Sequence, residues 1–152
     1  SRPTRTDCPV ETPEMRAERA RVMAARRAAH PEPTPEEEAA LRARAKELLP
    51  PLVAHWAQIM DVRPAGITIT GARTRFGSCS SKNRISYSWR LMQYPEAAID
   101  YVVVHELCHR KQMNHSAAFY KEVERVFPEY RKCQEWLKEN GGLYLSRLPR
   151  NN

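Results

Sequence analysis

Hydrophobic residues recur at helical spacing in the first part of the chain. Residues 34–37 form a capping box, in which Thr34 caps a helix and Glu37 completes the box. The predicted helix carries an apolar side chain every three or four positions, at Leu41, Ala45, Leu48, Leu52, Trp56 and Ile59. Pro50 and Pro51 interrupt this pattern. We expect them to kink or split the helix, because an interior proline lacks a backbone donor and clashes with the preceding turn.

Apolar and polar residues alternate after Pro64, which predicts β-strands. Ile67 and Ile69 alternate with threonines, and residues 73–78 form a second candidate strand. A polar turn at residues 80–83 leads into a third strand, in which alternate positions from 85 to 91 are apolar. Three short strands make a small sheet that needs helices on one face to be stable.

The second half of the chain predicts three more helices. The first begins at Pro95, and its segment 97–105 is apolar on nearly all sides, which is typical of a buried helix. Ser116 caps the next helix, whose buried stripe is Phe119, Val123 and Phe127. The last helix runs from about residue 129 to about 139 and ends at a glycine stop in residues 140–142.

The order of these elements indicates an α+β fold, with a small three- to four-stranded sheet packed on a helix and further helices at both ends. A thin apolar stripe also predicts a helix from Pro13 to about residue 29. We expect residues 1–33 to form a tail and this weakly docked helix, residues 34–145 the folded domain, and residues 146–152 a second tail.

The 152 residues carry a formal net charge of +7, which is unevenly distributed. The segment between Asp61 and Glu96 contains no acidic residue but holds Arg63, Arg73, Arg75, Lys82, Arg84 and Arg90. Such a stretch attracts anions, including phosphates, nucleic acid and acidic peptides. The alternative is a solvated face whose counter-charges come from elsewhere in the fold.

The sequence favours a cytoplasmic protein with no membrane partner. No secretory leader opens the chain, and its apolar stretches are shorter than the roughly 18 residues that a membrane span needs. The four cysteines, at positions 8, 79, 108 and 133, show no C-x-x-C spacing, so we expect reduced thiols.

The strongest chemical signal is the run from His105 to His109, an H-E-x-x-H motif on the predicted buried helix. Residues four apart lie on one helical face, so both imidazoles can bind a single zinc ion. Glu106 lies beside them and can take a proton from a zinc-bound water. Cys108 lies on the flank and is expected to pack rather than bind metal. The alternative is a pair of core histidines without a metal.

His115 follows His109 at the spacing found in longer zinc motifs, where a glycine lets the chain turn. Position 112 is glutamine here, so we expect Asn114 to make the turn in a left-handed conformation. Three histidine nitrogens leave a fourth position open, as in a catalytic rather than a structural zinc site.

Several motifs together resemble the YgjP-like family of zincin metallopeptidase domains. They occupy residues 75–82, 85–86, 89–91, 101–109, 114–116, 119 and 136–141. The resemblance covers residues 34–145 and implies a zincin-like fold, one zinc ion on His105, His109 and His115, and Glu106 as general base. The chain departs from the family pattern at Phe76, where tryptophan is usual, and in its short helical N-terminal region.

These observations predict a zinc-dependent metallohydrolase, first of all a metallopeptidase acting on peptides or proteins. The substrate strand would pair with segment 75–80. Candidate substrate-binding or oxyanion-stabilising residues are Arg75, Ser78, Arg90 and Tyr101.

Three alternatives stay open. A zinc-dependent nucleoside triphosphate hydrolase, an activity also ascribed to the family, would hold phosphates with the basic stretch 63–90. A DNA-associated zinc protease, or a nucleic-acid-binding module with structural zinc, would suit the charge, although no aromatic–basic motif indicates nucleic acid. Residues 1–33 could also cover the site, with Cys8 as a further zinc ligand.

Overall fold

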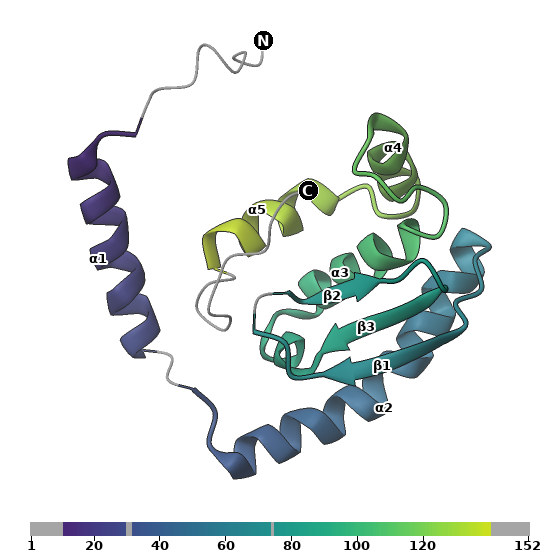
Figure 1. Cartoon of the computed structure of the whole chain (residues 1–152), viewed down its shortest axis with the longest axis horizontal. Helices are drawn as coiled ribbons and strands as arrows, with labels where there is room; N and C mark the ends of the chain where they lie inside the picture. The colour runs from purple at the N-terminus through teal and green to yellow at the C-terminus, as the bar shows by residue number, and fades with distance from the viewer. Residues whose placement is uncertain (1–10, 30–31, 74, 141–152) are drawn as a thin grey trace. The chain divides into compact units, whose positions relative to one another are not determined.

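The computed structural model describes residues 11–29, 32–73 and 75–140 (Figure 1). Its contacts divide the chain into two compact units, residues 1–31 and 32–152. The described part of the first unit is helix α1, Pro13–Ala29, which begins at the predicted proline. The Thr12 hydroxyl accepts a hydrogen bond from the Met15 N–H at 3.1 Å and so caps this helix. The predicted C-terminal tail and the predicted glycine stop at 141–142 lie outside the described residues, and the domain limits stay predictions.

Helix α2, Pro35–Met60, opens the second unit with the predicted capping box. Of the kink or split expected at Pro50 and Pro51, the split is wrong, because one continuous helix runs through both prolines. The carbonyl groups that lose their donors belong to Lys46 and Glu47, which are exposed residues, so water can satisfy them.

The buried face of α2 differs from the predicted stripe. Its buried residues are Ala45, Leu49, Val53, Ala57 and Met60. Leu48 and Leu52 are only partly buried, and Ile59 is 46% exposed. Both stripes are apolar, so periodicity alone could not choose between them; the packing of α2 against the sheet and α3 does.

A mixed three-stranded sheet follows, in the order β1-β3-β2. Strand β1, Gly66–Thr70, pairs in parallel with β3, Arg84–Ser88. Strand β2, Gly77–Cys79, pairs antiparallel with the other side of β3. The three predicted strands are confirmed, with β2 at one edge of the sheet.

Two predicted strand limits are wrong. The second strand was expected at residues 73–78, but β2 covers residues 77–79. The third ends at Ser88, where the Ser88 hydroxyl accepts the Arg90 N–H at 3.2 Å and starts a 3₁₀ helix, η2, Trp89–Gln93. A local side-chain cap therefore ends an alternating pattern that continues in the sequence to residue 91.

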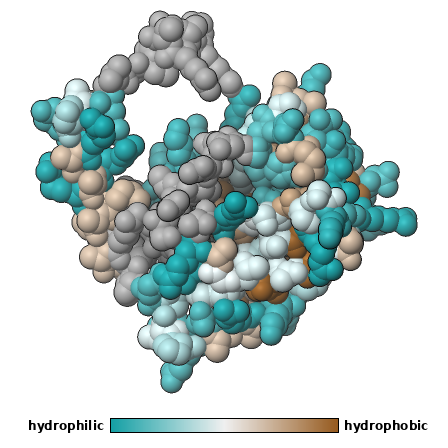
Figure 2. All heavy atoms as spheres, in the orientation of Figure 1, coloured by the Kyte–Doolittle hydropathy of each residue, from teal (hydrophilic) through white to brown (hydrophobic). Residues whose placement is uncertain are grey.

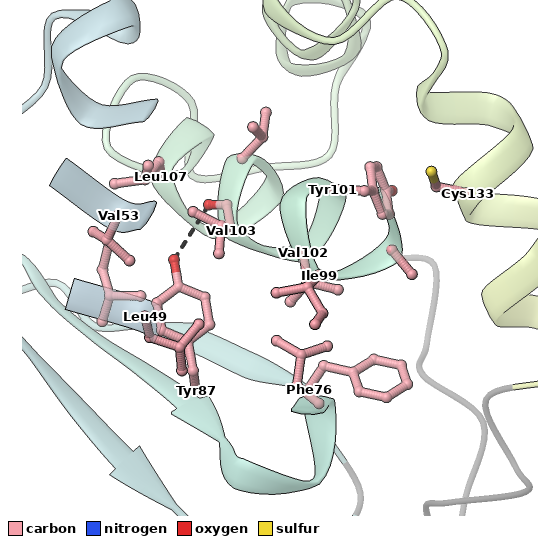
Figure 3. Packing of buried hydrophobic residues seen from close by; sticks show 14 of the residues in the cluster. Leu49, Val53, Phe76, Tyr87, Ile99, Tyr101, Val102, Val103, Leu107 and Cys133 are labelled. Atoms are coloured by element: carbon pink, nitrogen blue, oxygen red, sulfur yellow. Dashed lines mark hydrogen bonds between the residues drawn. The ribbon is translucent and has the colours of Figure 1, made fainter. Parts of the chain in front are cut away.

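Helix α3, Glu96–Cys108, lies against the sheet and is the centre of the core (Figure 1). Nine of its 13 residues are buried, as its apolar sequence predicts. Figure 3 shows Leu49 and Val53 of α2, Tyr87 of β3, and Phe76 packed near this helix. The buried Tyr87 hydroxyl donates a hydrogen bond to the Val103 carbonyl at 3.2 Å, which fixes β3 to α3.

Helices α4, Ala117–Val126, and α5, Tyr130–Asn140, pack on α3. The Ser116 hydroxyl caps α4 by accepting the Phe119 N–H, as predicted. Tyr130, Cys133 and Leu137 form the buried side of α5.

On the face drawn in Figure 2, hydrophilic side chains predominate and hydrophobic colouring is limited to small areas. Among the described helices, none has the length and apolar character required to cross a bilayer. The three cysteines in the described part, Cys79, Cys108 and Cys133, are free thiols, as expected.

Candidate metal centre

The structure brings the three predicted histidines together. His105 lies in the last turn of α3, His109 caps the end of that helix, and His115 comes from the loop before α4. One possible ligand atom from each residue lies within 4.8 Å of those from the other two. The Nε2 atoms of His105 and His115 are 3.0 Å apart.

The loop that returns His115 to α3 is built differently from the expectation. Among the described residues, positive φ angles outside glycine occur at Asp61 and Asn83, so the left-handed turn predicted at Asn114 is wrong. The chain turns instead as α3 tightens, with the Lys111 and Gln112 N–H groups both donating to the Cys108 carbonyl at 2.9 and 3.0 Å. These bonds continue the helical turns to Gln112, and residues 113–116 then lead into α4 without a left-handed residue.

Outer contacts orient two of the imidazoles. His109 Nδ1 lies 3.1 Å from the Gln112 carbonyl oxygen, which can only accept a hydrogen bond, so this nitrogen carries the proton. His105 Nδ1 lies 3.4 Å from the Tyr101 hydroxyl, on the side of the ring away from His115. Such partners are what a histidine ligand needs in order to present Nε2 to a metal.

The electrostatics favour neutral imidazoles. Burial, together with the neighbouring His109 and His115, lowers the pKa of His105 to about 3. Burial also lowers the pKa values of His109 and His115. Neutral rings keep a nitrogen lone pair free, and only that form binds a metal ion.

The spacing of the ligand atoms is compatible with one metal ion. Nitrogens bound to one tetrahedral zinc ion lie about 3.3 Å apart, and the three histidine ligand atoms lie within 4.8 Å of one another, so small movements of the rings would bring them to that spacing.

Glu106 lies beside the triad. The residue is 7% exposed, and its Oε1 is 4.0 Å from His105 Nε2. Burial raises the pKa of the Glu106 carboxyl to about 8, and the positive charge of Arg75 opposes this shift. The group is therefore a buried carboxyl whose protonation responds to nearby charge, as a general base requires.

Gly77 allows β2 to approach Glu106 closely. A Cβ atom at this position would lie 2.8 Å from the Ser86 carbonyl oxygen and 3.0 Å from Glu106 Cγ. The residue was part of the motif that carries the family resemblance, but the need for glycine there becomes visible only when β2, β3 and α3 are packed together.

We expect Gly77→Ala to lower the free energy of unfolding by about 1–3 kcal/mol, because the backbone of β3 cannot easily move away. Gly66→Ala is the matched control: the nearest atoms to its Cβ belong to the flexible Arg84 side chain at 3.7 Å. Urea unfolding of both variants measures the effect. Equal stability of the two variants would contradict the predicted clash.

The four candidate substrate-binding residues have different environments in the structure. Arg75 is exposed and acts electrostatically on Glu106, and Ser78 lies half-buried on the edge strand β2. Tyr101 is 5% exposed and contacts the outer nitrogen of His105, so it supports the triad from behind. Arg90 is 3% exposed, and its contacts are structural.

The Arg90 guanidinium stacks over Trp89 at 4.4 Å and bonds Glu32 at 2.9 Å. The guanidinium of Arg84 lies near Gly66 of β1, across β3 from β2. The acid-free basic stretch therefore does not converge as a whole on the histidines; Arg75 is the member with an electrostatic effect on Glu106.

Phe119 was predicted as a core residue of α4 and is one of the positions that carry the family resemblance, but no role at the metal centre was predicted for it. Its ring centroid lies 5.0, 4.7 and 4.9 Å from those of His105, His109 and His115, respectively. The available sequence signals were its position four residues after His115, in the first turn of α4, and its place among the motif positions. Those signals could not show contact with all three rings.

Comparisons with known proteins identify a family and a similar fold. None of the curated proteins matches the chain. The crystal structure of the metallopeptidase zymogen of Pyrococcus abyssi abylysin is similar in fold, with a TM-score of 0.53 at 23% identity, covering 65% of this chain and 96% of that one. The model of the YgjP-like metallopeptidase domain matches residues 11–140, which include the triad and Glu106. The chain therefore belongs to the YgjP-like metallopeptidase domain family.

Proposed function

We propose that this protein is a zinc-dependent metallopeptidase in which His105, His109 and His115 hold one zinc ion and Glu106 is the general base. Membership of a metallopeptidase family implies a divalent metal and a hydrolytic reaction. The observation that carries the proposal is the convergence of three imidazoles, with donor atoms within 4.8 Å, next to a buried carboxyl.

The donor set supports zinc rather than magnesium or calcium, which prefer oxygen ligands. Three histidine nitrogens leave a coordination position free, as catalytic zinc sites do. A bound zinc ion would polarise the scissile carbonyl, acidify a water molecule, and lower the pKa of Glu106 through its charge.

Glu106 then has two tasks. Its carboxylate accepts a proton from the attacking water and returns it to the leaving nitrogen of the cleaved peptide bond. The positive charge of Arg75 favours the ionised form of Glu106, in which the carboxylate can accept that proton. Burial of Glu106 limits access of bulk water to the carboxyl.

Strand β2 supports a peptide substrate. It lies at the edge of the sheet, beside Glu106, and pairs on one side with β3. An extended peptide can add to such an edge through backbone hydrogen bonds. Ser78, in the middle of β2, would then lie beside the substrate backbone.

The dispersal of the basic residues weighs against the nucleotide alternative. A triphosphate clamp on residues 63–90 needs several cations at one place. Arg73 and Arg90 both pair with the Glu32 carboxylate, which offsets part of their charge, and Arg84 lies near Gly66 on β1. This distribution of charge favours a peptide over a nucleotide as the substrate.

Turnover assays with zinc-loaded and chelator-treated protein test the function. The substrates are an unstructured casein-like protein and, separately, the four ribonucleoside triphosphates. We expect new peptide termini that appear with zinc, disappear with the chelator and return when zinc is restored. Zinc-dependent release of phosphate without any peptide cleavage would contradict the peptidase.

A further inference from the structure

We infer that Phe119 is a positioning residue for the metal centre: its ring is the common support of the three imidazoles and sets how well they bind a metal ion. The inference rests on the proposed metal-binding role of the triad. It concerns a residue that donates no ligand atom.

The ring of Phe119 packs against all three histidine rings. Phe119 is fully buried, and the centroids of all three histidine rings lie within 4.7–5.0 Å of its centroid. The rings of His105 and His115 meet it edge to face, at 70° and 65°, and the ring of His109 is tilted by 37°. These distances are at the short end of the usual range for aromatic pairs, about 4.5–7 Å. A displacement of the Phe119 ring would therefore affect all three histidines together.

Two hydrogen bonds hold the backbone of Phe119 in place and so limit where its ring can lie. The Phe119 N–H donates to the Ser116 hydroxyl at 3.3 Å, and Ser116 follows His115 directly. The Phe119 carbonyl accepts a hydrogen bond from Cys108 Sγ at 3.4 Å, and Cys108 precedes His109. Phe119 is thus tied to the residue next to each of two proposed ligands, on two different elements.

His115 depends most on this support. His105 and His109 belong to one helix, so their separation follows from helix geometry. His115 is a loop residue and reaches the other two across the turn at 110–114. Packing of Phe119 against all three rings holds the His115 ring close to those of His105 and His109.

The test compares Phe119→Leu with Val123→Ala in the full-length protein. Val123 lies one turn further along α4 and is also fully buried, but its aliphatic side chain is part of the hydrophobic core and has no aromatic ring. Zn²⁺ affinity is measured by competition with a chromogenic chelator, and Co²⁺ is added alone to record the visible absorption that reports coordination geometry. Urea unfolding of the metal-free proteins measures stability. Phe119→Met replaces the leucine variant if that variant does not fold.

We expect Phe119→Leu to weaken zinc binding about 10- to 100-fold, the usual effect of losing a residue that orients ligands, and to change the Co²⁺ spectrum. Val123→Ala should lose stability while its zinc affinity stays within about twofold of wild type. Unchanged affinity and spectrum in Phe119→Leu, or equal losses of affinity in both variants, would overturn the inference. Wild-type protein that binds zinc but cleaves no peptide would reject the proposed peptidase and leave this inference standing. Wild-type protein that binds no zinc would overturn both.

Discussion

Replacing Glu106 with glutamine is expected to lower kcat/KM for peptide hydrolysis by about 10²- to 10⁴-fold, the usual contribution of a general base. Glutamine has the same shape but cannot accept the proton from the attacking water. Its cost in stability should be small, because Glu106 is buried and its environment already disfavours the charged form. The comparison of kcat/KM values with a fixed peptide substrate measures the effect.

Zinc content separates loss of the base from loss of the metal. Glu106 is not a member of the histidine cluster, so the variant should bind zinc with the affinity of wild type. The control is Glu124→Gln, which removes an exposed carboxyl of α4 and should keep full activity. If Glu106→Gln binds zinc and keeps its activity within tenfold, Glu106 is not the general base.

Replacing His109 with alanine is expected to abolish most of the stabilisation that zinc gives to the folded protein. A ligand that binds only the native state at 100 times its Kd stabilises that state by about 2.7 kcal/mol. His109 is 8% exposed and is oriented by the Gln112 carbonyl, so alanine removes a preorganised donor and leaves two imidazoles. The loss of zinc affinity should exceed the roughly 10- to 100-fold cost of removing an outer contact.

Unfolding curves with and without zinc measure this effect. The difference between the two conditions is the relevant quantity, because loss of a buried ring that packs on Phe119 also destabilises the metal-free variant. His55→Ala, which removes an exposed histidine of α2, is the matched control and should retain the full stabilisation by zinc. An undiminished stabilisation of His109→Ala would mean that zinc binds elsewhere in the chain.

Features that depend on neighbouring residues could be predicted from the sequence. The capping box at 34–37, the start of α4 at Ser116 and the buried character of α3 follow from contacts within one or two helical turns. The shared face of His105 and His109 follows from the geometry of a single helix. The three strands were predicted because alternation has the period of a strand. The general base was predicted from the H-E-x-x-H motif and the third histidine from its spacing to His109, and the family resemblance implies the same roles.

Features that depend on packing between distant segments were decided only by the tertiary structure. Both stripes of α2 are apolar, and the contacts of the helix chose the face with Leu49 and Val53. The sequence shows that Arg75 and Arg90 are positively charged but not where their side chains lie. Only the structure shows that Arg75 acts on Glu106 and that Arg90 is buried against Trp89. The need for glycine at position 77 and the contact of Phe119 with three histidines arise where separate elements meet. The chemistry proposed for this chain could be predicted from the sequence, because its candidate residues lie in short motifs. The tertiary structure decided which residues surround it, because long-range packing has no local signal.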